Sequence, residues 1–261
     1  MGKVIVVKLG GATLGNHDTT LEDIVSLRQQ GWSVVVVHGG GKMITKWLKQ
    51  RGIATEFIDG ERVTDEATLE VVVSVLAGVV NKEIVADIDA LGGLAVGISG
   101  VDGAFIQGRI KSKKLGYIGE VVKVNPAPLQ ALLKAGYVPV VAPVSLNTGE
   151  KPPKAPRVLN INADVVAGEI AAAIGAEKLI FLTDVVGICD QSGNLLPRLS
   201  AAEAEALMAA GTASGGMIPK VKACLKALSG ASSACIIIDG RQPHALLNEI
   251  QGKGTGTVIK K

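Results

Sequence analysis

Lysines and glycines occur together at the ends of apolar runs in this chain of 261 residues. Lys8 follows the β-branched run 4–7, and Gly10 and Gly11 come shortly after it. Paired glycines allow backbone N–H groups to approach a phosphate, and a neighbouring lysine supplies a positive charge. The arrangement predicts an anion site; the alternative is a buried strand that ends in a solvated lysine and a tight turn.

The same arrangement occurs a second time. Residues 33–37 form another apolar run, which leads into His38 and the glycines 39–41, and residues 43–50 then have a helical pattern. A helix that begins just after a glycine loop adds the positive end of its dipole to an anion site. Two such loops after parallel strands predict adjacent sites of phosphate size.

Three charged residues elsewhere are candidates for the same chemistry. Arg62 can bind a carboxylate with two parallel hydrogen bonds, although an ordinary surface arginine is the alternative. Asp164 falls in the first turn of an expected helix that Asn162 can cap, so its carboxylate can point back toward a shared crevice. Lys220 lies one turn into another expected helix, after a pair of glycines.

Apolar runs alternate with segments of helical periodicity along the chain. Expected strands cover residues 4–7, 33–37, 94–98, 104–110, 119–124, 138–141, 178–182, 235–238 and 256–259. Expected helices cover residues 19–30, 43–50, 65–91, 201–209 and 217–228, together with one that begins at Pro126, an alanine-rich one that ends at Ile174 and a short one before the last strand. This alternation predicts an α/β fold with an open, mainly parallel central sheet sandwiched by helices.

Ligands of such sheets bind beyond the carboxyl ends of the strands, where Lys8 and both glycine loops would lie. The polar segment 147–156 and the position after Gly175 are candidate boundaries within the chain. We expect two lobes that share one continuous sheet rather than two independent domains.

The composition excludes several functional classes. Hydrophobic residues make up 48% of the chain, enough for a sizeable core, whereas aromatic residues make up only 3%, too few for a nucleic-acid stacking platform. The formal net charge of +3 comes from scattered basic residues, which favours small anionic ligands over nucleic acid. The longest apolar run, 71–80, is too short to span a membrane, so we expect a cytoplasmic protein.

Cysteine and histidine spacing offers no metal or disulfide signature. Cys189, Cys224 and Cys235 lack the CxxC spacing, and the three histidines stand far from one another. The sequence therefore predicts neither a zinc site nor a disulfide framework. The familiar nucleotide motifs are missing too: Gly41-Lys42 is followed by methionine rather than the Ser or Thr of a P-loop, and no G-x-G-x-x-G follows the first strand.

Seven motifs nevertheless occur in an order that resembles one known family. They are V-V-K-L-G-G (6–11), V-H-G-G-G (37–41), G-E-R-V-T-D (60–65), S-G-V-D-G (99–103), N-I-N-A-D (160–164), L-T-D-V (182–185) and G-G-M-I-P-K (215–220). The chain resembles the acetylglutamate kinases of the amino acid kinase superfamily, from its first strand to the closing G-T-G-T-V-I (254–259).

The resemblance implies transfer of a phosphoryl group from ATP to the side-chain carboxylate of N-acetyl-L-glutamate, the second step of arginine biosynthesis. It implies an acetylglutamate-binding and dimerisation lobe at 1–175 and a nucleotide-binding lobe at 176–261. Mg²⁺ would be held mainly by the nucleotide phosphates, so no protein ligand is expected for it. The chain begins close to the first strand, and we expect a homodimer insensitive to arginine.

The resemblance also implies roles for individual residues. Lys8 and Lys220 would flank the transferred phosphoryl group, with Asp164 holding both lysines. The remaining candidates would contact ligands: Gly10, Gly11, Gly40 and Gly41 through backbone N–H groups, Arg62 and Asn160 at the acceptor's α-carboxylate, and Thr183, Asp184, Gly215 and Met217 around the nucleotide.

One departure from the family pattern is Glu61, which stands at a usually apolar position beside Arg62. Two alternatives stay open. Another member of the superfamily would act on carrier-linked aminoadipate, aspartate or carbamate. A regulator that kept the fold but lost catalysis would bind acid and nucleotide without transferring phosphate.

Overall fold

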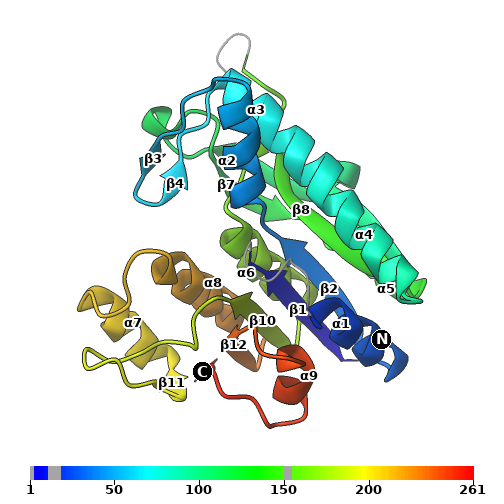
Figure 1. The fold of residues 1–261 in the computed structure, drawn as a ribbon, viewed down its shortest axis with the longest axis vertical. Coiled ribbons are helices and arrows are strands. Elements are labelled where there is room, and N and C mark those ends of the chain that lie inside the picture. Colours follow the sequence, from blue (N-terminus) through cyan, green and yellow to red (C-terminus); the bar gives the residue numbers. More distant parts are fainter. Residues whose placement is uncertain (1–2, 11–18, 150–154) are drawn as a thin grey trace.

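The computed structural model describes residues 3–10, 19–149 and 155–261 and has a central sheet with helices on both faces (Figure 1). Eleven strands form one sheet in the order β11-β13-β12-β10-β1-β2-β8-β6-β7, with β5 and β9 also paired to β8. Their bounds are β1 Val4–Leu9, β2 Ser33–His38, β5 Ala95–Gly100, β6 Ile106–Ile110, β7 Gly119–Val124, β8 Val138–Asn147, β9 Val158–Asn160, β10 Lys178–Thr183, β11 Arg198–Ser200, β12 Ala234–Asp239 and β13 Thr257–Lys260. The predicted continuous, mainly parallel sheet is confirmed.

The helices are α1 Thr20–Gln29, α2 Gly41–Gln50, α3 Glu66–Val73, α4 Asn81–Ala90, α5 Ala127–Lys134, α6 Ala163–Ile174, α7 Ala201–Ala209, α8 Met217–Ser229 and α9 Ala245–Ile250. A π-helical segment, Ser74–Val80, joins α3 to α4, so the single long helix predicted at 65–91 exists with one wider stretch inside it. Among the described residues, none of the helices has both the length and the apolar character that a membrane span requires.

Strand alternation divides the core into two layers. Along β1, Val6 belongs to one apolar cluster, together with residues of α5, α6 and α8, whereas Ile5, Val7 and Leu9 belong to another, together with residues of α1, α2, α3, α4 and α9. Lys8 is two residues after Val6 on the same strand, so its side chain points to the same face of the sheet, which α6 and α8 cover. Strand geometry alone thus sends this lysine toward two particular helices.

A short two-stranded hairpin, β3 Phe57–Ile58 and β4 Glu61–Arg62, stands apart from the main sheet. Figure 1 shows it at the edge of the upper part of the molecule, beside α2. Its Gly60 has a φ of 80°, a left-handed conformation that a glycine adopts without strain. The hairpin carries Arg62 on a loop excursion between α2 and α3.

The prediction about cysteines is wrong in one respect. Cys224 on α8 and Cys235 on β12 form a disulfide in the core, with their Cα atoms 5.3 Å apart. The two residues meet because α8 packs against the strand that follows it. Tertiary packing made this pair, and a search for CxxC spacing does not detect such pairs.

Candidate active site

Two lysines from opposite halves of the sequence meet at one buried carboxylate. The ammonium of Lys8 lies 2.7 Å from Oδ1 of Asp164, and the ammonium of Lys220 lies 3.0 Å from Oδ2. The Lys220 contact is a hydrogen bond, whereas the Lys8 contact is an ion pair without hydrogen-bond alignment. The three side chains come from β1, α6 and α8, and the structure thus brings together the three residues that the sequence analysis names as catalytic candidates.

Local structure explains why these groups converge. Asn162 caps α6 by accepting hydrogen bonds from the amides of Asp164 and Val165, which fixes Asp164 in the first turn. One turn further on, Gly168 packs so closely on Ala223 that a Cβ there would lie 2.7 Å from the Ala223 carbonyl oxygen. This contact lets α6 and α8 approach until their charged residues touch.

The electrostatics of Asp164 depend on both partners. Burial by itself raises the pKa of this carboxyl, but the two adjacent ammonium groups outweigh burial and hold its pKa below the usual range. Asp164 therefore stays ionised at neutral pH with both oxygens engaged. Such a carboxylate orients cations and is a poor proton acceptor.

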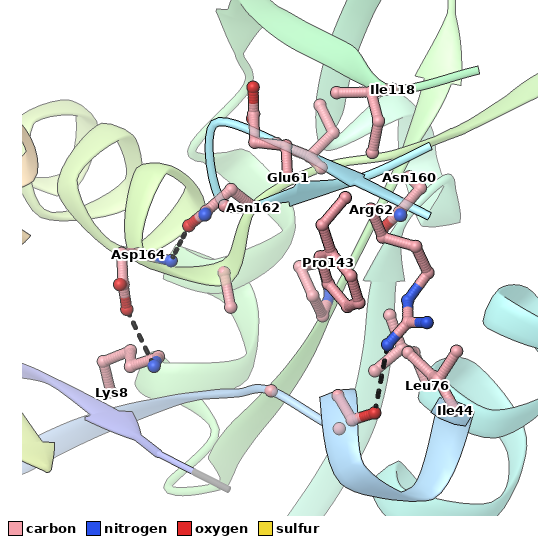
Figure 2. Close-up of a pocket in the computed structure, with 17 residues that line it drawn as sticks. Lys8, Ile44, Glu61, Arg62, Leu76, Ile118, Pro143, Asn160, Asn162 and Asp164 are labelled. Atoms are coloured by element: carbon pink, nitrogen blue, oxygen red, sulfur yellow. Dashed lines mark hydrogen bonds and ion pairs between the residues drawn. The ribbon is translucent and has the colours of Figure 1, made fainter. Parts of the chain in front are cut away.

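A cavity of about 230 Å³ opens beside this cluster. Figure 2 shows Lys8 and Asp164 on one side of it and Arg62 and Asn160 on the other. Its lining residues are Lys8, Gly39, Gly40, Gly41, Ile44, Phe57, Gly60, Glu61, Arg62, Leu76, Ile118, Pro143, Asn160, Ile161, Asn162, Ala163 and Asp164. Four sequence-predicted acceptor residues, Gly40, Gly41, Arg62 and Asn160, thus share one cavity with two of the predicted catalytic ones.

Arg62 is held so that part of its guanidinium stays unsatisfied. Its Nη2 donates hydrogen bonds to the Gly41 carbonyl oxygen (3.2 Å) and to Oγ1 of Thr45 (2.8 Å), and its Cζ atom lies 4.6 Å from the ring centre of Phe57. Nη1 is buried and has no hydrogen-bond partner among the described residues. A buried donor without a partner favours an incoming anion.

A chain of hydrogen bonds ties Asn160 to the same hairpin. Asn160 Nδ2 donates to Oγ1 of Thr64 (3.2 Å), whose hydroxyl donates to the Arg62 carbonyl oxygen (2.8 Å). Thr64 is completely buried. The next residue, Asp65, caps α3, whereas Thr64 links the two acceptor-side residues.

A second cavity, of about 480 Å³, lies at the carboxyl ends of β10 and β12. Its lining residues are Asp184, Val185, Val186, Gly187, Ile188, Cys189, Asp190, Thr212, Ala213, Ser214, Met217 and Arg241. Asp184 and Met217 are therefore placed at it, whereas Thr183 and Gly215 lie next to lining residues in the chain. Val185 and Val186 are exposed apolar side chains there.

Gly10 and Gly11 are predicted to donate their backbone N–H groups to phosphate. The Gly10 amide donates a hydrogen bond to the Leu182 carbonyl oxygen (3.0 Å), and a Cβ at Gly10 would lie 2.9 Å from that same oxygen. This glycine lets β1 and β10 approach, so its amide is not the phosphate donor that the sequence predicts. Gly11 lies outside the described residues.

Thr45 and Thr64 are site residues that sequence reasoning missed, because a threonine that hydrogen-bonds to an arginine has no sequence signature of its own.

The described part of the site shows no cluster of metal-ligating side chains. Among the described residues, no group of three or more His, Cys, Asp or Glu side chains could hold an ion.

Comparison with known proteins identifies one family for this chain. The Amino acid kinase family model matches residues 3–239. The chain is 50% identical over 256 residues to the acetylglutamate kinase of Dehalococcoides mccartyi, across 98% of this chain and 94% of that protein.

Solved structures agree on the fold. The crystal structure of smu.665 from Streptococcus mutans UA159 matches with a TM-score of 0.83 and 25% identity, over 100% of this chain and 99% of that one. The N-acetylglutamate synthase of Neisseria gonorrhoeae matches with a TM-score of 0.85 and 28% identity, over 100% of this chain and 60% of that one. The chain therefore belongs to the amino acid kinase family, and within it to the acetylglutamate kinases.

Proposed function

We propose that the protein transfers the γ-phosphoryl group of ATP to the side-chain carboxylate of N-acetyl-L-glutamate, forming N-acetyl-L-glutamyl 5-phosphate. The observation that carries the proposal is the pair of lysines held by Asp164. Lys8 and Asp164 line one side of a cavity whose other side contains Arg62 and Asn160 (Figure 2). Lys220 reaches this cluster through Asp164 without lining the cavity. One side suits a transferring phosphoryl group, and the other suits the α-carboxylate of an amino acid.

The chemistry needs no general base. A side-chain carboxylate has an ordinary pKa of about 4.3 and is already ionised at neutral pH, so it can attack phosphorus directly. What the reaction needs is in-line placement of acceptor and donor, and neutralisation of charge on the phosphoryl oxygens. Lys8 and Lys220 supply that charge, and Asp164 fixes their positions without accepting a proton.

Acceptor selection rests on Arg62. The free N–H groups of Nη1 can receive an α-carboxylate, while Thr45 and the Gly41 carbonyl hold the other nitrogen in place. Asn160 lies in the same wall and is oriented by Thr64. Lysine cannot reproduce this fork of donors, so the arginine itself is expected to matter.

The nucleotide is proposed to occupy the second cavity. Every lining residue of that cavity lies within 176–261, and every lining residue of the first lies within 1–175, which supports the assignment of an acceptor lobe and a nucleotide lobe. The exposed side chains of Val185 and Val186 offer an apolar surface for a base. Thr183, Asp184, Gly215 and Met217 stay the proposed nucleotide residues.

Mg²⁺ is proposed to arrive with ATP, held by phosphate oxygens and water. Small dications prefer a few carboxylates plus substrate phosphates, and the one buried carboxylate of this site is engaged by two lysines. The protein residues therefore do not form a cage for it, and the proposal assigns it no protein ligand.

A substrate panel tests the function. Purified protein with ATP is offered acetylglutamate, glutamate, aspartate, carbamate and a carrier-linked aminoadipate, with coupled detection of ADP and hydroxylamine trapping of the acyl phosphate. Acetylglutamate is expected to be the preferred acceptor. Preference for another acid would assign the protein to a different reaction of its family, and binding of acid and nucleotide without ADP release would identify a regulator.

Assembly as a homodimer and a cytoplasmic location stay predictions. Sedimentation velocity at micromolar concentration tests the first, with a mass near twice that of the chain as the expected result.

A further inference from the structure

His38 ends β2 immediately before the glycine loop, yet it is completely buried behind that loop. Gly39, Gly40 and Gly41 form the cavity wall in front of it. The proposed mechanism assigns no task to this ring. A fully buried imidazole next to a binding loop must satisfy both of its nitrogens, and its partners show what it does.

The hydrogen bonds of His38 define its protonation. Nδ1 lies 2.9 Å from the Gly39 carbonyl oxygen, which can only accept, so Nδ1 carries the hydrogen. Nε2 lies 3.2 Å from the Asn81 amide nitrogen, which can only donate, so Nε2 is bare. The ring is therefore neutral, and burial followed by the charges of Lys8 and Lys82 lowers its pKa to about 4.

Asn81 is itself fixed in one orientation. Its Nδ2 also donates to the Val140 carbonyl oxygen (2.9 Å), and its Oδ1 accepts from the ammonium of Lys82 (3.0 Å). Gly97 makes room for it, because a Cβ there would overlap Oδ1 of Asn81. The direction of donation thus runs from Lys82 through Asn81 and His38 to the glycine loop.

The helical segment just before Asn81 also contacts the glycine loop 39–41 directly. Its π-helical segment packs Leu76 against Gly40, where a Cβ would lie 2.7 Å from the leucine Cδ2. Figure 2 shows Leu76 at the cavity, near Arg62. The wider helical turn therefore touches the loop from one side, and the residue just after it holds the loop through His38 from another.

We propose that His38 and Asn81 are positioning residues for the acceptor substrate. In a trans peptide the carbonyl of one residue and the N–H of the next point in opposite directions, and no peptide bond among the described residues is cis. Holding the Gly39 carbonyl on the buried ring turns the Gly40 N–H away from His38, toward the cavity that Gly40 lines. This N–H then donates to an acceptor oxygen. The inference rests on the proposed function.

The tautomer can be measured without any substitution. The chain has only three histidines, so their ring ¹⁵N signals are readily assigned with His17 and His244 variants. We expect one histidine to remain neutral with hydrogen on Nδ1 from pH 5 to 8. A His38 that titrates near pH 6.5, or that carries hydrogen on Nε2, would overturn the proposal.

Kinetics test the positioning role. His38→Phe keeps the volume but removes the donor to Gly39, whereas His38→Asn retains an N–H group near the Nδ1 position. For His38→Phe we expect the acetylglutamate KM to rise about 10-fold with the ATP KM within 2-fold, and His38→Asn to recover most of that loss. His244→Phe and His244→Asn, at a half-exposed histidine far along the chain, are the matched controls.

Two patterns would contradict the proposal. Equal losses in both His38 variants, or equal effects on the two substrates' KM values, would mean that His38 only fills the core. If His38→Phe does not fold, Lys82→Met tests the outer link, with an expected rise of about 2-fold in acetylglutamate KM and an unchanged value counting against the network. A wild-type protein that ignores acetylglutamate in the substrate panel would instead refute the proposed function and leave the tautomer result standing.

Discussion

The cations at the two ends of the acceptor cavity have different partners. At the Asp164 end, one carboxylate lies between two ammonium groups, so each cation already has an anionic partner and one of the two positive charges is compensated before any ligand arrives. At the Arg62 end, a buried guanidinium has only neutral partners, and its Nη1 has none among the described residues. Burying an incompletely satisfied cation is unfavourable, so an anion is expected to bind most tightly there.

The difference separates binding from catalysis. Cations that already share a carboxylate gain less from the ground state of the substrate, and they are held in place for the charge that develops during transfer. An uncompensated guanidinium gains from the α-carboxylate equally in the ground state and in the transition state. Substitutions at the two ends should therefore change different kinetic constants.

The largest effect is expected at Lys8. Lys8→Ala removes one of the two cations and should lower kcat by about 10²–10³-fold, while the acetylglutamate KM changes less than about 3-fold. Steady-state kinetics with both substrates measure this split. Lys3→Ala, at an exposed lysine just before the same strand, is the control and should leave both constants unchanged. An intact kcat in Lys8→Ala would remove this lysine from the reaction.

The neutral ring behind the glycine loop gives a pH prediction. Below pH 6.5 an unfolded histidine binds a proton, whereas folded His38, which Lys8 and Lys82 face, stays neutral down to about pH 4. The unfolded state therefore binds more protons in this window, and stability should rise with pH across it by about 3 kcal/mol. Urea unfolding at several pH values measures this dependence, and the stability of wild type relative to His38→Asn should increase as the pH rises from about 4 to 6.5. Parallel curves would contradict the buried neutral ring.

Arg62→Lys tests the binding end. A single ammonium cannot keep Thr45 and the Gly41 carbonyl and also receive a carboxylate through two parallel bonds, so the acetylglutamate KM should rise about 10- to 30-fold with kcat within about 3-fold. Arg51→Lys, at a half-exposed arginine just after α2, is the matched control. A loss confined to kcat would place Arg62 in the chemistry and abolish the contrast between the ends.

The smallest effect is expected from Glu61, which forms an ion pair with Lys111 and so ties the Arg62 hairpin to the segment before β7. Because this pair is partly exposed, Glu61→Gln should raise the acetylglutamate KM only about 2- to 3-fold. The double reversal Glu61→Lys with Lys111→Glu should restore part of the loss. Glu120→Gln, which breaks an exposed pair with Arg109, serves as control. Additive effects of the two reversals would show that the ion pair does not position the hairpin.

Much of this site follows from local pattern. The β-branched run of β1 predicts a buried strand, alternation sends Lys8 to the same face as Val6, and the Asn162 cap places Asp164 in a first helical turn. The meeting of these groups with Lys220 needed the resemblance to a family, because the close contact of Gly168 with Ala223 cannot be recognised from spacing. The same limit applies to the disulfide, which joins a helix to the next strand.

Other features depend on contacts that one-dimensional patterns do not encode. Gly10 looks like a phosphate loop glycine, but its amide is used by the neighbouring strand, and only the register of β1 with β10 reveals this. Thr45 and Thr64 act through hydrogen bonds to Arg62, which the residues next to them in the sequence do not reveal. The neutral state of His38 follows from Asn81, a residue 43 positions away.

Equilibrium binding of acetylglutamate tests the division between the two ends most directly. Isothermal titration calorimetry without nucleotide should give wild type and Lys8→Ala dissociation constants within about 3-fold of each other, while Arg62→Lys binds about 10-fold or more weakly. The reverse order, with binding lost in Lys8→Ala and retained in Arg62→Lys, would contradict the assignment of binding to the Arg62 end and of catalysis to the Asp164 end.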